Sequence, residues 1–296
     1  MKYTSLSQYL KKEYGEKYYK LSLSCATTCP NRDGICGDKG CIFCSSKGSG
    51  DFAQSALLPI SSQIEKAKSV VSNKSLSDRY IAYFQAFTST YGDINYLRSV
   101  FLETIKRDDI AILSIATRPD CLSNEVITLL KELVDIKPVW VELGLQSIHE
   151  STAHYIRRGY DTPVYFEAVE KLKVLGIHVI THVIIGLPNE TKEMIVETVK
   201  EVGKVTDGIK LQLLHVLKGT DLAVDYENRK FEVLSLEEYA DILCECICVL
   251  PENVVVHRLT GDGDKNTLIA PLWTKDKKRV LNYINHRIAT FEKNNT

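Results

Sequence analysis

Three cysteines near the amino terminus have the clearest chemical potential in this sequence. Cys29, Cys41 and Cys44 lie in the stretch CPNRDGICGDKGCIFC, and the last two form a C-x2-C pair. Thiolates on a glycine-containing loop can hold an iron–sulfur cluster, because the backbone there can approach the cluster closely. Four cysteine ligands would close a 4Fe–4S cluster, whereas three leave one iron open to a small molecule. The pattern therefore predicts a cluster with chemistry at the open iron.

Two other interpretations use the same residues. A zinc site usually closes with four ligands, and Cys25 or Cys36 could supply a fourth thiolate. No histidine precedes His149, so a mixed Cys/His site has no local partner. A disulfide framework fits poorly with nine cysteines, an odd number, in a long chain for which no signal peptide is expected. A reducing cytoplasm fits these features best.

The composition sets ordinary bounds. With 296 residues and 44% hydrophobic content, the chain can bury one large core or two small ones. No apolar run approaches the roughly 20 residues that span a bilayer. A net charge of −1 excludes a wholly basic nucleic-acid-binding surface but leaves room for local patches. In the absence of a long Pro/Gly/Ser linker, we expect one continuous domain.

Short apolar runs that alternate with amphipathic segments predict the fold. The strands are β-branched and nearly continuously apolar, which is typical of a parallel sheet covered on both faces. A strand–helix alternation repeated about six times predicts an α/β barrel, complete or partial, with a doubly wound open sheet as the alternative. The expected strands are Tyr18–Leu23, Arg79–Phe84, Ile110–Ile115, Val139–Leu143, His178–Ile185 and Gly208–Leu214, with Val254–Arg258 as a candidate further strand. The expected helices are Ile60–Val71, Ile94–Arg107, Asn124–Val134, Pro163–Leu175 and Lys192–Val205.

Polar or flexible residues follow nearly every predicted strand. In a parallel α/β barrel the active site lies at the carboxyl ends of the strands, so these residues should share one rim with the cysteines. In chain order they are Gln85 and Thr88; Thr117, Arg118 and Asp120; Glu142 and Gln146; Gly186 and Pro188; and His215 and Lys218.

Nine sequence blocks resemble the radical S-adenosylmethionine (radical SAM) superfamily. They are TCPNRDG, GCIFC, YFQAFTSTY, ATRPDCL, ELGLQS, IRRGYD, HVIIGLPNET, LLHVLKGT and HRLTGD. Within the superfamily, the chain resembles the branch related to the elongator catalytic subunit and the oxygen-independent coproporphyrinogen oxidase. The common C-x3-C-x2-C signature is absent, and the wider spacing between Cys29 and Cys41 matches this branch. The resemblance implies a partial (β/α)6 TIM-like barrel with a C-terminal helical extension.

The resemblance also implies two cofactors, a 4Fe–4S cluster and S-adenosylmethionine (SAM). One electron from the cluster would cleave SAM to a 5′-deoxyadenosyl radical, which abstracts hydrogen from the substrate. The implied iron ligands are Cys29, Cys41 and Cys44. The implied SAM-binding residues are Phe43 beside the cluster and adenine; Gln85 and Thr88 near the methionine amine; Gln146 and Arg158 (or its neighbour Arg157) for ribose or carboxylate; and Ile184, Ile185 and Gly186 beside adenine.

Each of these assignments has a structural alternative. Gln146 and Glu142 could instead satisfy backbone groups, Arg158 could be a solvated surface residue, and His215 could be a hydrogen-bonded barrel residue. Cys244, Cys246 and Cys248 are expected to be packed core residues on a helix, because alternate helical positions cannot grip one metal. Cys121 is expected to be structural.

Positive charge gathers at the two ends of the chain. Residues 265–296 contain seven Lys or Arg and two Asp or Glu, and residues 1–20 contain five Lys and two Glu. These ends could flank an RNA-binding rim, with a solvated basic helix as the alternative. We expect residues 1–270 to form the radical SAM barrel, including an N-terminal helix and the cluster loop. Residues 271–296 would then form a basic helical extension.

Within the branch, the chain is similar to bacterial enzymes that act on the wobble uridine of transfer RNA. They convert its carboxymethylaminomethyl group to aminomethyl. This similarity implies a cytoplasmic enzyme with tRNA as a partner, an electron donor such as flavodoxin or ferredoxin, and no membrane. The implied substrate-contact candidates are Arg118, Glu142, His215, Lys218, Arg258 and Asp262. A radical enzyme acting on a small metabolite and a non-enzymatic iron–sulfur electron carrier are the alternatives.

Overall fold

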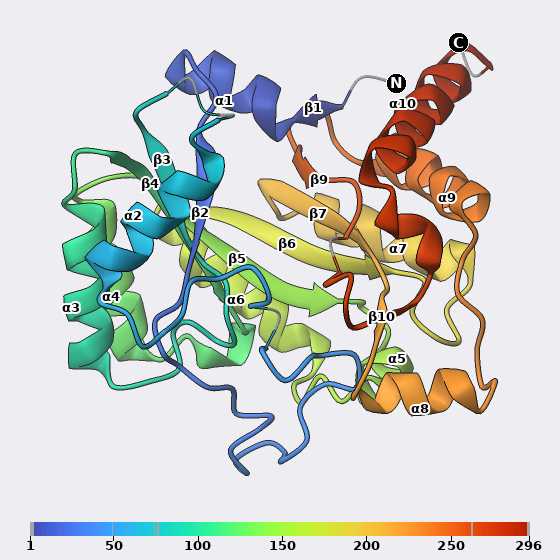
Figure 1. Ribbon diagram of the computed structural model, residues 1–296, viewed down its shortest axis with the longest axis horizontal. Coiled ribbons are helices and arrows are strands. Elements are labelled where there is room, and N and C mark those ends of the chain that lie inside the picture. Colours follow the sequence, from blue (N-terminus) through green and yellow to red (C-terminus); the bar gives the residue numbers. More distant parts are fainter. Residues whose placement is uncertain (1–2, 49, 74, 76, 262, 295–296) are drawn as a thin grey trace.

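The computed structural model describes residues 3–48, 50–73, 75, 77–261 and 263–294. Its main element is a curled sheet of eight parallel strands in the order β1-β9-β7-β6-β5-β4-β3-β2 (Figure 1). The strands are β1 (Thr4–Ser5), β2 (Tyr19–Leu23), β3 (Tyr80–Phe84), β4 (Ile110–Thr117), β5 (Val139–Gln146), β6 (His178–Ile185), β7 (Gly208–Leu213) and β9 (Val255–Arg258).

The strand order confirms the partial barrel. From β2 to β7 each strand pairs with the next one along the chain, whereas a doubly wound sheet reverses its order part-way. The six main predicted strands are all present, and β9 is the candidate further strand. The two-residue strand β1 was not predicted, because Thr4–Ser5 is too short to show a periodic pattern.

Helices cover the outer face of the sheet. The five predicted helices are α2 (Ile60–Val71), α3 (Ile94–Ile105), α4 (Asn124–Val134), α6 (Thr162–Val174) and α7 (Lys192–Gly203). The others are α1 (Leu6–Tyr14), α5 (Glu150–Tyr155), α8 (Asp221–Glu227), α9 (Leu236–Val249) and α10 (Lys277–Asn294). Two short 3-10 turns, Pro119–Cys121 and Leu272–Lys275, and the antiparallel pair β8 (Val216–Leu217) and β10 (Leu268–Ala270) complete the fold. The helix starts follow the sequence: Asp93 accepts a bond from the Tyr96 amide, and Ser235 forms a capping box with Glu238.

The strands separate two environments, because successive side chains point to opposite faces. On β5, Val139, Val141 and Leu143 join the main core beneath the outer helices. Trp140 faces inward instead, where it packs with Leu10 of α1 in a second apolar cluster. Glu142, two residues further along β5, lies on the same inner face and is completely buried. The barrel interior is therefore apolar beside α1 and polar toward the carboxyl ends of the strands.

The C-terminal helix α10 packs against α9. Val280, Ile284 and Ile288 are buried in the main core, and Arg287 pairs with Asp241 of α9 at 2.5 Å. The division of the chain after residue 270 stays a prediction, although this packing joins the extension closely to the barrel.

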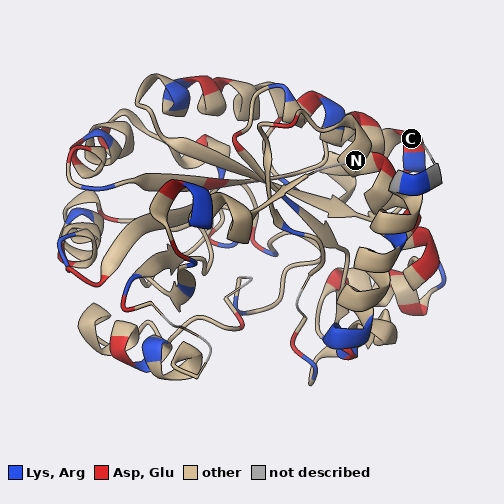
Figure 2. Ribbon diagram, turned by 90° about the horizontal axis from the view of Figure 1, so that it is seen from above, with Lys and Arg blue, Asp and Glu red and all other residues tan. Residues whose placement is uncertain are grey.

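The cysteines of α9 are only partly in the core. Cys244 and Cys246 are buried as predicted, but Cys248 is exposed, so the prediction is wrong for Cys248. Acidic and basic residues both occur over the outer helices (Figure 2). Among the described residues, no helix is both long and apolar enough to cross a membrane.

Candidate active site

The three cysteines lie on a long connection between β2 and α2, residues 24–59, which we call the cysteine loop. Its described part contains no helix or strand and is held by backbone and side-chain hydrogen bonds. Arg32 donates from Nη2 to the carbonyl oxygens of Cys44 (3.0 Å) and Ser45 (2.7 Å), so it joins the two ends of the cysteine motif. Gly40 has φ +76°, and a Cβ there would lie 2.9 Å from Arg32 Nε. A glycine at position 40 lets this arginine cross the loop.

Asn31 connects the cysteine loop to the segment after α5. Its Nδ2 donates to the carbonyl oxygens of Arg157 (2.8 Å) and Arg158 (3.0 Å), and it also lies 3.4 Å from Cys41 Sγ. A Cβ on Gly159 would come within 2.3 Å of Asn31 Oδ1. The CPNRDG and IRRGYD motifs are therefore interlocked, although more than a hundred residues separate them.

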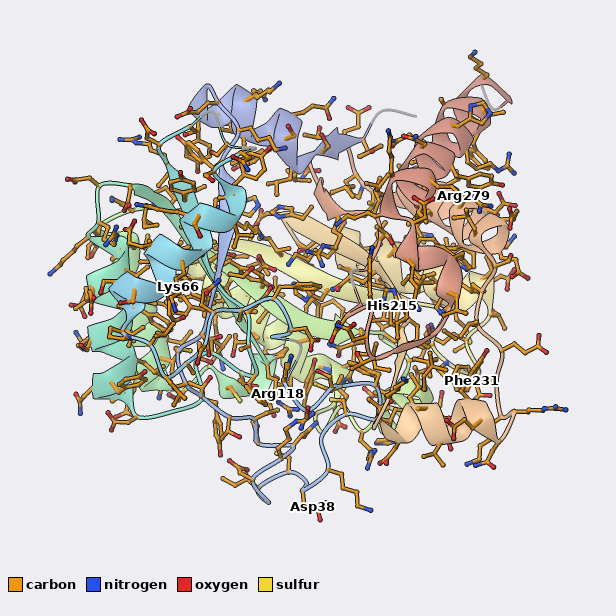
Figure 3. All side chains as sticks on the ribbon, in the orientation of Figure 1. Asp38, Lys66, Arg118, His215, Phe231 and Arg279 are labelled. Carbon is orange, nitrogen blue, oxygen red and sulfur yellow. The ribbon has the colours of Figure 1, made fainter. Side chains whose placement is uncertain are left out.

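One cavity at the carboxyl ends of the strands brings most of the predicted site residues together. Of the residues assigned from the sequence, those lining it are Cys29, Cys41, Phe43, Cys44, Gln85, Thr88, Thr117, Arg118, Glu142, Gln146, Arg158, Ile184 and Arg258. Several predicted residues lie elsewhere. Ile185 is packed in the main core, Lys218 is exposed, and His215 packs against Gly261 and Gly263, apart from Arg118 (Figure 3). Gly186 does not line the cavity either, and Asp262 lies outside the described residues.

Gln146 reaches the cavity through an irregularity at the end of β5. The register to β6 shifts between Gly144 and Gln146, and Gln146 has φ +68°. A Cβ on Gly144 would lie 2.8 Å from the Gln146 amide nitrogen, so the glycine makes room for this side chain. Such bulges often re-aim a side chain next to an active site.

Arg118 places a fixed positive charge beside the cysteines. Its guanidinium pairs with both carboxylate oxygens of Asp120, at 2.9 and 2.7 Å, and donates to the Arg158 carbonyl oxygen at 2.7 Å. Burial alone would lower the pKa of Arg118, but the hydrogen bonds and charge of Asp120 outweigh it and raise the pKa. The substrate contact assigned to Arg118 stays a prediction; its visible bonds are all to protein groups.

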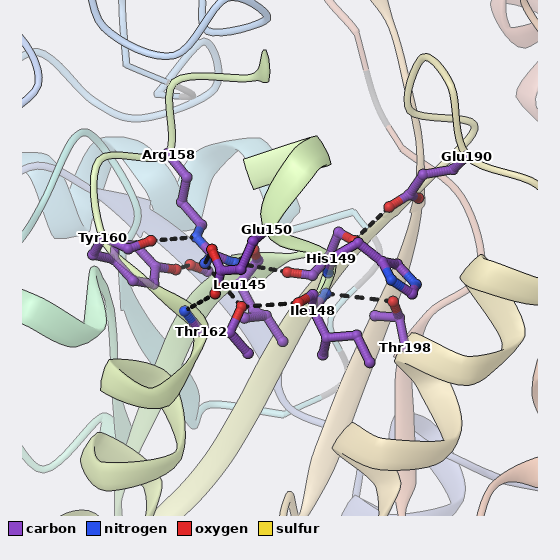
Figure 4. Close-up of polar contacts among 11 residues, drawn as sticks. Leu145, Ile148, His149, Glu150, Arg158, Tyr160, Thr162, Glu190 and Thr198 are labelled. Carbon is purple, nitrogen blue, oxygen red and sulfur yellow. Dashed lines mark hydrogen bonds and ion pairs between the residues drawn. The ribbon is translucent and has the colours of Figure 1, made fainter. Parts of the chain in front are cut away.

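Arg158 is almost completely buried, at 1% exposure, and its donors are engaged by the protein (Figure 4). Nε donates to the Tyr160 carbonyl oxygen (2.9 Å), and Nη1 donates to that of Ser147 (2.7 Å). Nη2 contacts Thr162 Oγ1 (3.0 Å) and Glu150 (3.4 Å). A direct bond to a SAM carboxylate would require exchanging some of these bonds. The neighbouring Arg157 points to Asp221 of α8 instead.

A buried group of polar side chains forms the inner end of the cavity. We call Lys20, Glu142, His182 and Lys210 the charged floor. Glu142 Oε1 accepts from Lys20 Nζ (2.5 Å) and Ser114 Oγ (2.8 Å), and Oε2 accepts from His182 Nε2 (2.7 Å) and from Lys210. Sequence reasoning singled out Glu142 but missed the two lysines and His182. The three residues lie on predicted strands, but the sequence does not show that they meet Glu142; the one local signal is Lys210, a lysine within an apolar strand.

The charges of the floor determine its protonation. Burial would raise the pKa of Glu142, but Lys20 and Lys210 outweigh it and hold the pKa well below its usual value. Burial lowers the pKa of His182 to about 4, so this imidazole is neutral near pH 7 and donates one N–H to Glu142. Burial also lowers the pKa of both lysines, and Glu142 opposes that shift.

Comparisons with known proteins identify the family. A model of the Radical SAM superfamily matches residues 26–202, and a model of the Radical_SAM C-terminal domain matches residues 206–290. The chain belongs to the radical SAM superfamily. It is an enzyme of that superfamily, whose cofactors are a 4Fe–4S cluster and SAM.

The relatives place this radical SAM enzyme in the Elp3-related branch. It is 42% identical to the protein YtqA of Bacillus subtilis, over 97% of this chain and 89% of that one. It is also 29% identical to a tRNA uridine(34) acetyltransferase of Methanocaldococcus infernus, over 54% of this chain and 30% of that one. The solved structure of Elp3 from M. infernus has a TM-score of 0.63 at 18% identity, which shows a shared fold. That match covers 89% of this chain and 64% of the Elp3 chain.

The cavity fits a cluster better than a single zinc ion. Two thiolates on one tetrahedral zinc lie roughly 3.8 Å apart, because each Zn–S bond is about 2.3 Å. Among the described residues, no set of three cysteines brings its sulfur atoms within 4.8 Å of one another. Cys29, Cys41 and Cys44 nevertheless line one cavity, as ligands of a larger group would.

Two further observations suit the radical SAM cofactors. The buried Gln85 Nε2 has no hydrogen-bond partner among the described residues, and Gln85 lines the cavity. It therefore offers a hydrogen bond to a ligand. Burial and the neighbouring Cys44 raise the pKa of Cys41 to about 12, a shift that iron would overcome, since a coordinating thiol loses its proton.

Proposed function

We propose that this radical SAM enzyme acts on the wobble uridine of transfer RNA and converts its carboxymethylaminomethyl group to aminomethyl. The observation that carries the proposal is a groove that brings the two basic ends of the chain together and shares a residue with the active-site cavity. The similarity to a tRNA uridine(34) acetyltransferase supports the same substrate class.

The groove lies between α1, β9 and α10. Lys17 from the amino-terminal end and Lys277 from the carboxyl-terminal end both line it, together with Arg258 of β9. Arg258 also lines the cavity with the three cysteines. Lys275, Lys278 and Arg279, near Lys277, are exposed. Lysine and arginine side chains on such a surface bind phosphates without reading sequence, and so they hold an RNA in place.

The proposed reaction removes the carboxymethyl carbons as one product. When bound, the cluster and SAM supply a 5′-deoxyadenosyl radical. With these cofactors as acceptors of one hydrogen atom and one electron, the substrate methylene carbon next to the carboxylate would become part of an iminium. Water would add to the iminium, and the C–N bond would break to release the aminomethyl nucleoside and glyoxylate. The bound cofactors would thus supply the two-electron oxidation that the reaction requires.

The chain's own residues would position these groups. Cys29, Cys41 and Cys44 are the proposed iron ligands, and Phe43, Gln85, Thr88, Gln146 and Ile184 the proposed SAM contacts. Arg158 is proposed to act mainly as a positioning residue, because its bonds fix the backbone of Leu145 and Ser147 beside Gln146.

The proposed electron donor is an acidic carrier such as flavodoxin or ferredoxin. Another pocket lies beside Cys41 and Cys44 and is also lined by Arg32, Lys39 and Arg157. Lys39 is exposed. Positive charge close to the cysteine motif would steer an acidic protein toward the cluster.

The test is a reaction of anaerobically reconstituted protein with SAM, dithionite and tRNA that carries carboxymethylaminomethyl-uridine. Mass spectrometry of the digested tRNA should show aminomethyl-uridine, and glyoxylate should form in equal amount. A Lys277→Glu/Lys278→Glu/Arg279→Glu variant should convert the RNA more slowly than the natural protein. Its RNA turnover should also no longer depend on the salt concentration. Its SAM cleavage without substrate should be unchanged.

A matched control is Lys200→Glu/Lys204→Glu at the C-terminal end of α7, which reverses charge outside the groove. This variant should convert tRNA like the natural protein. If 5′-deoxyadenosine forms while the nucleoside stays unchanged, the RNA substrate is wrong and the radical chemistry stands.

A further inference from the structure

The charged floor brings two amines, those of Lys20 and Lys210, against one carboxylate, Glu142. Burial lowers the pKa of both lysines and the nearby Arg258 adds to this shift, so Glu142 only partly stabilises their charged forms. His182 adds no charge near neutral pH. Placing several cations around one carboxylate in a buried site is costly unless an anion completes the group.

Lys210 is the member of the floor best placed to meet a ligand. It lines the cavity with the three cysteines, although it is only 4% exposed. An ammonium group has three N–H donors. Glu142 and Tyr83, whose hydroxyl lies 3.2 Å from Nζ, account for two of them among the described residues. A third donor is therefore left for a group that enters the cavity.

We propose that the charged floor binds a carboxylate of the substrate, with Lys210 as the direct ligand and Arg258 as a second cation. Glu142 is a positioning residue, because Lys20, Ser114, His182 and Lys210 already occupy both of its oxygens. It holds Lys210 in place and does not contact the substrate.

The burial of the site selects the chemistry of the ligand. A group that reaches an amine with 4% exposure must be small and at the end of a substituent. A backbone phosphodiester, which continues into the next nucleotide on both sides, does not meet that requirement. A terminal carboxylate does. The carboxymethylaminomethyl group ends in one, so this inference rests on the proposed function for the identity of the substrate but not for the site itself.

The experiment measures binding of a small probe to the reconstituted protein with SAM, before any electron is supplied. The probe is radiolabelled N-methylglycine, which carries the same amine and carboxylate as the substrate group, in equilibrium dialysis. We expect one probe molecule per chain and competition by acetate. N-methylglycine amide, which lacks the carboxylate, should bind at least tenfold more weakly.

Two substitutions with opposite effects distinguish a ligand from a structural residue. Lys210→Gln should weaken probe binding at least tenfold. Glu142→Gln should strengthen it or leave it unchanged, because it removes the negative charge that competes with the probe. Lys204→Met, at the exposed residue that follows α7, is the matched control and should bind like the natural protein. Iron content and the melting temperature of each variant show whether it is folded.

The outcomes separate this inference from the proposed function. Equal binding of the probe to the natural protein and to folded Lys210→Gln overturns the carboxylate site. Equal binding of N-methylglycine and N-methylglycine amide to the natural protein also overturns it, since the carboxylate is then not the group that the site recognises. If phosphate binds more tightly than N-methylglycine, the floor is a phosphate site and the carboxylate assignment is wrong. If the probe binds as expected but tRNA is not converted, the carboxylate site stands and the RNA substrate is wrong.

Discussion

The cysteine loop and the charged floor line the same cavity but are held by different interactions. In the loop, side chains bond to backbone atoms: Arg32 to the carbonyls of Cys44 and Ser45, and Asn31 to those of Arg157 and Arg158. In the floor, side chains on four strands, β2, β4, β6 and β7, bond to one carboxylate, that of Glu142 on β5. A loop of this kind can adjust to the group that it holds, whereas the floor is fixed by the sheet.

This difference suggests a division of labour in the enzyme. The loop supplies thiolates to a cluster, and its backbone must fit that cluster closely. The floor offers charge at a fixed position, and fixed charge costs little reorganisation when a substrate binds or reacts. Substitutions in the loop should therefore act first on the cofactors, and substitutions in the floor first on the substrate and on stability.

The largest effect is expected in the loop. Cys29→Ala, Cys41→Ala and Cys44→Ala should each abolish the signal of the reduced cluster in electron paramagnetic resonance, because each removes one of three thiolates. Anaerobically prepared natural protein should contain about four irons per chain.

The matched controls for the cysteine substitutions are Cys25→Ala and Cys36→Ala. Cys25 is buried and lies 3.5 Å from the Ser89 carbonyl oxygen, whereas Cys36 is exposed. Both variants should keep most of the iron. Loss of the cluster in Cys36→Ala together with its retention in Cys29→Ala would make the ligand assignment wrong.

An intermediate effect is expected at Arg158, between the loop and the floor. Arg158→Ala leaves the buried carbonyl of Ser147 and the half-buried carbonyl of Tyr160 without their donor, at a cost of roughly 2–4 kcal/mol in the free energy of unfolding. SAM affinity should fall about tenfold to hundredfold, because the backbone of Leu145 and Ser147 beside Gln146 loses its support.

Arg157→Ala is the control for Arg158, because it changes the adjacent arginine, which pairs with Asp221 at the surface. Arg157→Ala should lower the free energy of unfolding and the affinity for SAM less than Arg158→Ala does. Weaker SAM binding without any loss of stability in Arg158→Ala would favour a direct contact over positioning. Small and equal effects from both variants would remove Arg158 from the site.

The elements were more predictable from the sequence than the contacts between them. The spacing of Cys29, Cys41 and Cys44 is local, and α2, α4 and β6 begin and end at the predicted residues because apolar periodicity defines them. The floor was not predictable in this way. Lys20, Glu142 and Lys210 lie on separate strands, and only the register of the sheet brings them together. A lysine in an apolar strand, such as Lys210 in GIKLQL, is the one local signal that could have indicated it.

The smallest effect concerns the pH dependence of stability and arises in the floor. Because burial lowers the pKa of His182 from 6.5 to about 4, the unfolded chain binds more protons than the folded one between these values. Stability should therefore rise with pH across this window. His182→Gln keeps an N–H donor for Glu142 but does not titrate, so the slope should fall by up to about 1.4 kcal/mol per pH unit.

Urea unfolding at several pH values between about 4.5 and 6.5 measures this slope. His178, whose pKa burial also lowers to about 4, should leave a residual slope in the His182→Gln variant. An unchanged slope in that variant would mean that His182 is not held neutral beside Glu142.

The most direct test of the whole account follows one hydrogen atom across the cavity, from the substrate to SAM. The substrate is tRNA whose carboxymethylaminomethyl-uridine carries deuterium on the methylene next to the carboxylate. After a single turnover with reconstituted enzyme, SAM and dithionite, the account predicts 5′-deoxyadenosine with one deuterium and an equal amount of aminomethyl-uridine. Unlabelled 5′-deoxyadenosine together with an unchanged nucleoside would contradict it.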